Sequence, residues 1–257
     1  MCIRDSYRTV LPEHHKALAV PEGVTGTVVV EASLWLEDNA WILDLAAQDP
    51  HIVGLVGHID PDRPGFGADL ARFAANPLFR GIRCSGRYFE DVERGTFLAD
   101  MEILAAHDLE LDVLVRQQHV DGLLTLACRL PELCIVVDHI AHMPIDGQAV
   151  KPEWVEIYGR MAEQPNVYIK VSAVMEQSTV QPAPVGVDFY RPALDAMWTA
   201  FGENRVIYGS NWPVCERAGT FKQSIDIVKA YLANKGQAAW DRYFWRNGQA
   251  AYKWRQT

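Results

Sequence analysis

The chain has 257 residues, of which 49% are hydrophobic and 22% charged, with a formal net charge of -9. The acidic balance and the absence of long basic stripes argue against a nucleic-acid partner. No run approaches the roughly 18 consecutive apolar residues of a membrane span. We therefore expect one soluble barrel domain over residues 1–257, because this length suits a single α/β barrel.

Five cysteines occur in the sequence, and their number and spacing bear on the compartment. An odd count without a C-x-x-C motif predicts reduced thiols rather than a disulfide framework. The first ten residues, MCIRDSYRTV, show neither an apolar signal core nor an Arg- and Ser-rich transit pattern. Both observations predict a cytoplasmic protein. The cysteines are Cys2, Cys84, Cys128, Cys134 and Cys215.

Seven apolar runs, each ending in a polar or charged residue, alternate with helix-like segments. Continuous Val, Ile and Leu runs are typical of parallel strands that are covered on both faces. The runs span 27–33, 52–60, 79–84, 109–116, 133–141, 166–174 and 205–212. The helix-like segments, with apolar spacings of three and four, span 37–49, 66–77, 95–108, 120–131, 153–165, 190–202 and 220–233. A closing helix is expected over 238–254. This order predicts a TIM-type (β/α)8 barrel.

The predicted barrel is one strand short. Residues 1–25 contain a helix-like stretch at 12–19 but no apolar run, so we expect an irregular N-terminal region. Either the barrel is naturally open, or the chain lacks the first strand that a full-length relative carries; we favour the second. Residues 177–188 read as a long loop after a strand and as a candidate lid.

Active sites of such barrels lie where the strands end, so the polar residues at the strand ends are candidates for chemistry. Because side chains alternate along a strand, each end residue shares a face with the residue two positions earlier. The expected inward pairs are Val29 and Glu31, Val56 and His58, Gly81 and Arg83, Leu114 and Arg116, Val137 and His139, Lys170 and Ser172, and Gly209 and Asn211. Asp138 is expected to face the helices. A purely structural ion pair between Glu31 and Arg83, or a core role for His58, is the alternative, but seven polar groups together favour a site.

Two segments carry the most specific signals. In VVDHIAHMP (136–144), His139 follows a buried run, where it could donate to an oxyanion, accept a proton or bind a metal. In VIYGSNWPV (206–214), Gly209 allows close backbone approach, and Trp212 with the following proline fixes the loop.

Together with FRGIR (79–83), NVYIKVSA (166–173) and the terminal FWRNGQAAYKW, these segments resemble the amidohydrolase-related family. The likeness is to its sugar-lactonase branch, which includes rhamnono- and fucono-lactonase-like proteins and pyrone dicarboxylate lactonase. It extends over residues 26–254. The resemblance implies a (β/α)8 barrel that hydrolyses a cyclic ester. It matches His139 to the family's sixth-strand histidine and Arg83 to its fourth-strand substrate arginine.

The sequence departs from the family pattern at two places. The first-strand His-x-His is missing, because His14 and His15 are adjacent and His139 and His142 are three apart. Asn211 stands where many relatives have an aspartate, and an amide cannot deprotonate water. Full-length relatives imply a divalent metal, zinc or manganese. Here only His139 and Glu31 can be named as a partial ligand set, so a metal is left open.

Lactone hydrolysis needs an activated water and donors aimed at the carbonyl oxygen. We expect His139 with Arg83 or Arg116 to polarise the carbonyl, and Glu31 to act as base, since it is taken as the only carboxylate on the inward faces. Burial would raise its pKa and nearby arginines would lower it. The remaining residues, Asn211, Ser172, His58, Lys170 and Trp212, are expected to position water or substrate.

Two other functions stay open at this point. A metal-dependent decarboxylase of the same superfamily would need the full ligand set. A truncated or inactive barrel would only bind a sugar acid. In each case we expect a small-molecule ligand, and the sequence is compatible with a homo-oligomer.

Overall fold

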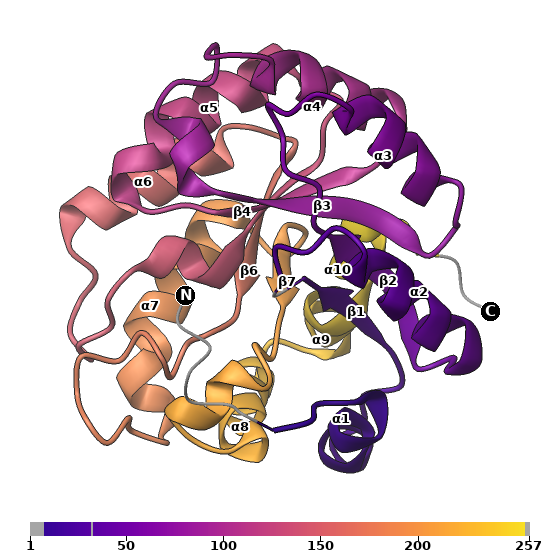
Figure 1. Cartoon of the computed structure of the whole chain (residues 1–257). Helices are drawn as coiled ribbons and strands as arrows, with labels where there is room; N and C mark the ends of the chain where they lie inside the picture. The colour runs from indigo at the N-terminus through magenta and orange to yellow at the C-terminus, as the bar shows by residue number, and fades with distance from the viewer. Residues whose placement is uncertain (1–7, 32, 255–257) are drawn as a thin grey trace.

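The computed structural model describes residues 8–31 and 33–254, so Cys2 and the first part of the predicted N-terminal region lie outside the described residues. Within these ranges, one parallel sheet runs in the order β1-β2-β3-β4-β5-β6-β7 and curls into an incomplete barrel (Figure 1). The strands are β1 Thr27–Val30, β2 Ile52–Gly57, β3 Phe79–Ser85, β4 Glu110–Leu114, β5 Ile135–Val137, β6 Val167–Val171 and β7 Val206–Tyr208. All seven predicted runs contain a strand, which confirms the fold class.

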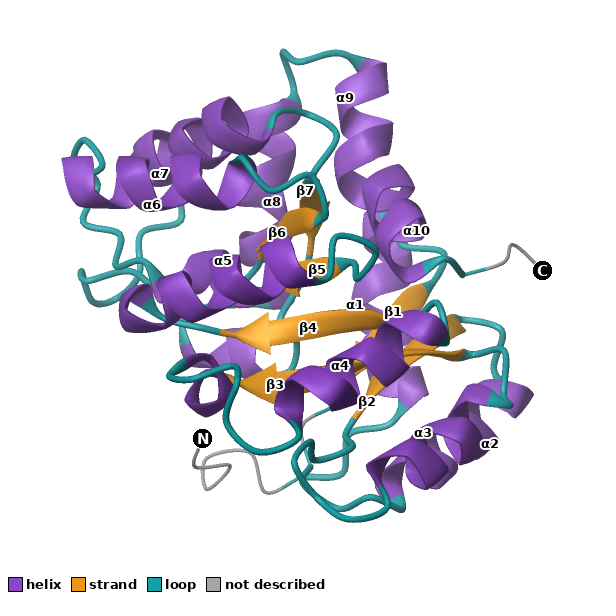
Figure 2. Ribbon diagram, turned by 90° about the horizontal axis from the view of Figure 1, so that it is seen from above, coloured by secondary structure: helices purple, strands orange, loops and turns teal. Residues whose placement is uncertain are grey.

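Helices alternate with the strands and cover the outside of the sheet (Figure 2). They are α1 Pro12–Ala19, α2 Asp38–Gln48, α3 Phe66–Ala74, α4 Phe97–Ala106, α5 Val120–Arg129, α6 Pro152–Ala162, α7 Val187–Phe201, α8 Phe221–Leu232, α9 Gln237–Asp241 and α10 Asn247–Tyr252. A π-helical turn, Arg242–Arg246, joins α9 to α10. In the described part of the chain, no helix has the length and apolarity to cross a membrane.

The apolar core has an outer and an inner part. The outer faces of the strands, for example Leu55 and Ile169, pack against the helices in one large cluster. A smaller cluster lies inside the curled sheet, where Val56 and Ile207 contact Tyr252 of α10. Because α10 packs there against residues from several strands, it closes one end of the barrel. The polar strand ends lie at the other.

The sheet ends at β1 and β7, which do not pair with each other among the described residues. His15 of α1 lies beside both regions. Its Nδ1 is 3.2 Å from Nε2 of His51, which precedes β2. Its ring centroid lies 5.4 Å from that of Trp212, which follows β7. Helix α1 therefore bridges the two ends of the sheet with side chains rather than with a strand ladder.

Candidate active site

A buried network of opposite charges fills the interior of the barrel. Nζ of Lys170 lies 2.6 Å from Oδ2 of Asp112 and 2.7 Å from Oδ1 of Asp138. Arg83 places Nη2 2.8 Å from Oδ2 of Asp138. The hydroxyl of Tyr252 donates to Oδ1 of Asp112 at 2.9 Å. Two cations and two carboxylates thus come from successive strands, so the interior charges compensate one another.

Asp138 lies inside the barrel, so its predicted orientation toward the helices was wrong. Its side chain has no exposed area. Val136 shares this inner face, whereas Val137 packs outward with the helices. The inward pair predicted for β5 therefore fails at Val137. The reason is local: β5 ends at Val137, and His139 has φ of 53°, so the alternation of a strand does not continue to it.

The inward face of β1 was also assigned wrongly. Val28 and Val30 pack with the inner cluster, and Val29 packs with the outer one. Glu31 follows the strand and lies beside Arg83, whose Nη1 donates to the Glu31 backbone oxygen at 3.0 Å and whose charge lowers the pKa of the Glu31 carboxyl. The inward pairs of β2, β3 and β6 agree with the structure at Val56, Arg83 and Lys170, which make contacts in the interior. Gly209 also faces inward, because a Cβ there would meet Ser172 and Lys170.

His139 reaches the site through the left-handed turn after β5. Its Nδ1 lies 2.7 Å from Oγ of Ser172, which is buried at the end of β6. The pKa of His139 is lowered to about 3, mainly by burial; Asp138 raises it, and the nearby Arg83 and Lys170 lower it. His139 is therefore neutral near pH 7, where it can form hydrogen bonds but is a weak proton acceptor.

Glu31 has the opposite behaviour. The pKa of Glu31 is raised to about 7, mainly by burial; Arg83 lowers it, and Asp138 and Asp112 raise it. Glu31 is thus partly ionised at neutral pH. The expectation that it is the only inward carboxylate was wrong, because Asp112 and Asp138 also lie inside. Those two are bound to Lys170 or Arg83, so Glu31 remains the better proton acceptor.

Asn211 lies three residues after β7, has a φ of 54°, and donates from Nδ2 to Oε1 of Glu176 at 2.6 Å. Glu176 belongs to the loop after β6, and sequence reasoning missed it. Burial raises its pKa, and the hydrogen bond from Asn211 lowers it. The sequence signal for it is weak: it is a carboxylate in the loop after β6, in the segment VSAVMEQST, five residues beyond Val171.

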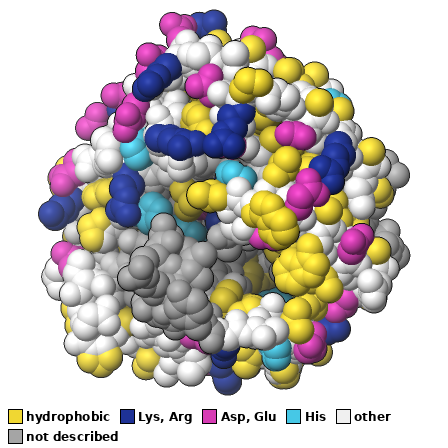
Figure 3. All heavy atoms as spheres, viewed as in Figure 1, with side chains coloured by type: hydrophobic (Ala, Val, Ile, Leu, Met, Phe, Trp, Pro, Cys, Tyr) yellow, Lys and Arg dark blue, Asp and Glu magenta, His cyan; other side chains and the backbone are white. Residues whose placement is uncertain are grey.

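The remaining predicted residues, His58, Arg116 and Trp212, lie around the rim. The imidazole Nδ1 of His58 is buried without a hydrogen-bond partner among the described residues. Arg116 is exposed. The pKa of His142 is lowered mainly by burial and next by the charge of Arg116. Trp212 is half-buried and donates from Nε1 to Glu216 at 2.9 Å. In the space-filling view, several His side chains gather near the middle of the face shown, with Lys and Arg around them (Figure 3).

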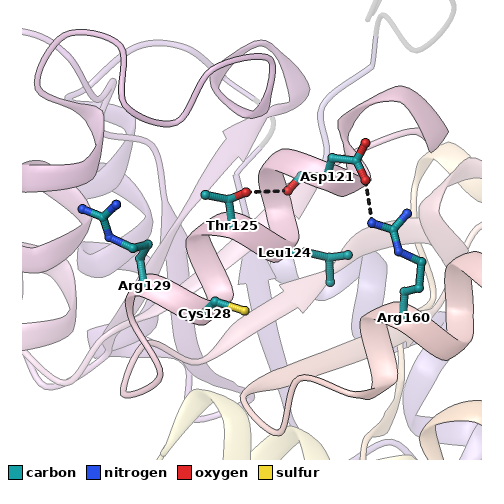
Figure 4. A pocket seen from close by; sticks show the side chains of 6 residues that line it. All are labelled: Asp121, Leu124, Thr125, Cys128, Arg129 and Arg160. Carbon is teal, nitrogen blue, oxygen red and sulfur yellow. Dashed lines mark hydrogen bonds and ion pairs between the residues drawn. The ribbon is translucent and has the colours of Figure 1, made fainter.

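A wide depression lies elsewhere, on the helical layer. It measures about 450 Å³ and is lined by α5 and α6, including Cys128, Arg129 and Arg160 (Figure 4). Nη2 of Arg160 pairs with Oδ1 of Asp121 at 2.6 Å. Its polar side chains are exposed and lie on the outer helices, so this depression is separate from the barrel interior.

The donor set does not fit a resident metal ion. Within residues 8–31 and 33–254, no group of three or more His, Cys, Asp and Glu side chains is arranged to hold one. The buried carboxylates Asp112 and Asp138 are already compensated by Lys170 and Arg83. A divalent cation placed there would be repelled by both of these positive charges.

Comparison with known proteins gives consistent matches. The family model described as Amidohydrolase matches residues 4–254. An L-fucono-1,5-lactonase of Burkholderia ambifaria is 34% identical over 221 residues, which cover 84% of this chain and 74% of that protein. Crystal structures of an amidohydrolase from Burkholderia multivorans, one with bound HEPES and one with bound zinc, give TM-scores of 0.87 and 0.82. They are 21% and 22% identical, and each match covers 96% of this chain and 90% of that chain.

Proposed function

This chain belongs to the amidohydrolase family, and we propose that it is a hydrolase that opens the ring ester of a sugar-acid lactone. The relative from Burkholderia ambifaria, named for lactone hydrolysis, supports the reaction class. The observation that carries the proposal is the placement of Arg83, His139 and Glu31 around one buried charge network. This arrangement combines donors for a carbonyl oxygen with a carboxylate that titrates near neutral pH.

The first step is attack of water on the lactone carbonyl. Glu31 takes a proton from the water, while the water oxygen forms a bond to the carbonyl carbon. The carbonyl oxygen gains the displaced electron pair, and Arg83 and neutral His139 donate hydrogen bonds to it. The guanidinium of Arg83 stays charged because burial, which lowers its pKa, is outweighed by the carboxylates of Asp138 and Asp112.

The substrate is bound by the surrounding polar side chains. Ser172 and Asn211 orient water or sugar hydroxyls, and Lys170 keeps the network electrically balanced. Arg116, His58 and Trp212 contact the outer part of the substrate at the rim. No step is assigned to a metal ion, because the described donors do not form a ligand set.

The proposal also includes the location of the protein, the size of its substrate and its oligomeric state. Cys84, Cys128, Cys134 and Cys215 are free thiols, which supports the expected cytoplasmic location. The substrate is a small molecule, in line with the family. A homo-oligomer stays a prediction that the molar mass in solution would test.

A panel of aldonolactones, followed by proton release, tests the proposal. We expect Glu31→Gln and His139→Asn to lower kcat by 10²–10⁴-fold, roughly the contribution of a general base or an oxyanion donor. Circular dichroism and the melting temperature report whether each variant folds. The exposed Glu102→Gln and His107→Asn serve as matched controls. Wild-type turnover in both site variants would defeat the assignment, and a wild-type protein inactive on the whole panel would defeat the proposed function.

A further inference from the structure

Glu176 is a buried carboxylate that the steps above leave without a role. Oε1 accepts the hydrogen bond from Nδ2 of Asn211 at 2.6 Å. Oε2 is equally buried, and no hydrogen-bond partner for it exists among the described residues. A buried polar atom without a partner is costly unless water or a ligand satisfies it. The free oxygen therefore needs an occupant.

Contacts along the strand ends place this carboxylate at the same site as His139. A Cβ on Gly209 would lie 2.8 Å from Cβ of Ser172, so β7 and β6 approach closely there. Ser172 in turn lies 2.7 Å from His139. Gly209 and Asn211 lie in the segment that follows β7, and Nδ2 of Asn211 donates to Glu176. Oε2 of Glu176 therefore lies on the same side of the barrel as His139, along the ends of β6 and β7.

The surroundings of Glu176 differ from those of Glu31. Glu31 lies beside Arg83, whose charge stabilises the ionised carboxylate. Glu176 accepts a hydrogen bond from the neutral amide of Asn211, and its charge helps to raise the pKa of Tyr190 in α7 and of Cys215. Burial is the largest influence on its pKa and raises it. A carboxyl in neutral surroundings favours its protonated form, and one beside a guanidinium favours its ionised form.

We propose that Glu176 is the general acid that protonates the departing ring oxygen, with Asn211 as the positioning residue that fixes its orientation. The proposal rests on the proposed lactone hydrolysis and completes its second step. When the tetrahedral intermediate collapses, the carbonyl re-forms and the bond between carbon and ring oxygen breaks. The ring oxygen keeps that electron pair and takes the proton from Oε2 of Glu176.

The two carboxyls then hold opposite states from those at the start. Glu31 has gained the proton of the attacking water, and Glu176 has lost its own. Proton exchange with solvent resets both groups. The product is the open hydroxy acid, whose carboxyl group ionises at neutral pH and releases one proton per turnover. Acid and base are thereby separate side chains, each with an environment that favours the state it needs.

Leaving-group chemistry separates this role from a structural one. An alkoxide leaving from an aldonolactone needs a proton, whereas a phenolate leaving from dihydrocoumarin does not. We expect Glu176→Gln to lower kcat on the aldonolactone by 10²–10⁴-fold and on dihydrocoumarin by less than about 5-fold, with KM little changed. Glu102→Gln, exposed and remote, is the matched control. Equal losses on both substrates, or none on either, would overturn the role of Glu176 while leaving the proposed function standing.

The pH profile of the wild type provides a second readout, which does not depend on the folding of a variant. Wild-type kcat/KM should rise as Glu31 ionises and fall as the acid ionises at higher pH, giving a bell shape. Asn211→Ala should move the falling limb, because it removes the hydrogen bond that lowers the pKa of Glu176. A wild-type profile without a falling limb would contradict the inference. Inactivity of the wild type on every lactone would overturn both this inference and the function on which it rests.

Discussion

Nζ of Lys170 lies 2.6 Å from Oδ2 of Asp112, and both side chains are buried inside the barrel. The same ammonium also lies 2.7 Å from Asp138. Removing it leaves two carboxylates with the single guanidinium of Arg83. Removing one partner of a buried ion pair lowers the stability far more than losing a surface pair, because the remaining charge stays desolvated.

Lys170→Met should therefore lower the free energy of unfolding by about 3–5 kcal/mol. Urea denaturation monitored by tryptophan fluorescence measures the change. The double variant Lys170→Met with Asp112→Asn should lose less than the sum of the two single variants, because the two side chains interact directly. Lys235→Met, a cation on the surface, is a control. Additive effects would mean that the pair does not act as one unit.

Glu31 links stability to pH. Its pKa is about 7 in the folded chain against 4.5 for the unperturbed group, mainly through burial. Between these values the folded chain holds a proton that the unfolded chain has released. The free energy of unfolding therefore falls as pH rises from 4.5 to 7, by roughly 3 kcal/mol from this residue.

The glutamine side chain of Glu31→Gln cannot ionise, so the variant should lack this fall in the free energy of unfolding. Unfolding measured at pH 5 and pH 7 should show the variant gaining stability relative to the wild type at the higher pH. Glu102→Gln should show no such difference. A gap between variant and wild type that stays constant from pH 5 to pH 7 would contradict the raised pKa of Glu31.

The arrangement of strands and helices could be predicted from the sequence, because short apolar runs, several of them rich in Val and Ile, alternate with helix-like segments. The extent of the strands could not. The run at 133–141 contains a strand only at Ile135–Val137, after which the backbone at His139 takes a positive φ. Counting alternation backward from His139 therefore reversed the face of Asp138, which lies in the interior.

The site was predictable where a residue lies on a regular strand and not where a turn places it. Arg83 and Lys170 were correctly directed inward, since β3 and β6 alternate regularly through them. Glu176 lies in a loop, where sequence spacing says nothing about direction. Its contact with Asn211 depends on the packing of the loops after β6 and β7, which no local pattern encodes.

Arg116 tests substrate binding without disturbing the core. Its side chain is exposed, and its backbone amide, which donates to Nδ1 of His119, is kept in Arg116→Ala. The free energy of unfolding should change by less than about 0.5 kcal/mol. Loss of a charge-assisted hydrogen bond to the substrate should raise KM about 10–100-fold with kcat little affected. Exposed Arg94→Ala is the matched control, and an unchanged KM in Arg116→Ala would remove this residue from the binding site.

Metal removal tests whether catalysis depends on the charged side chains rather than on a bound metal ion. Lys170 and Arg83 compensate Asp112 and Asp138, and His139 with Glu31 offers only a partial ligand set. We expect protein treated with a chelator to keep its turnover within about 2-fold and its melting temperature within about 2 °C. Elemental analysis should find far less than one zinc or manganese ion per chain.

The contrary outcome is equally specific. Restoration of a lost activity by one equivalent of zinc would show that a ligand set forms in solution, because a site with three protein ligands binds zinc stoichiometrically. His139→Asn and Glu31→Gln would then weaken zinc binding measured by calorimetry, whereas His107→Asn, on the exposed side of the chain, would not. If the zinc affinity of both site variants equals that of the wild type, the bound metal lies away from His139 and Glu31.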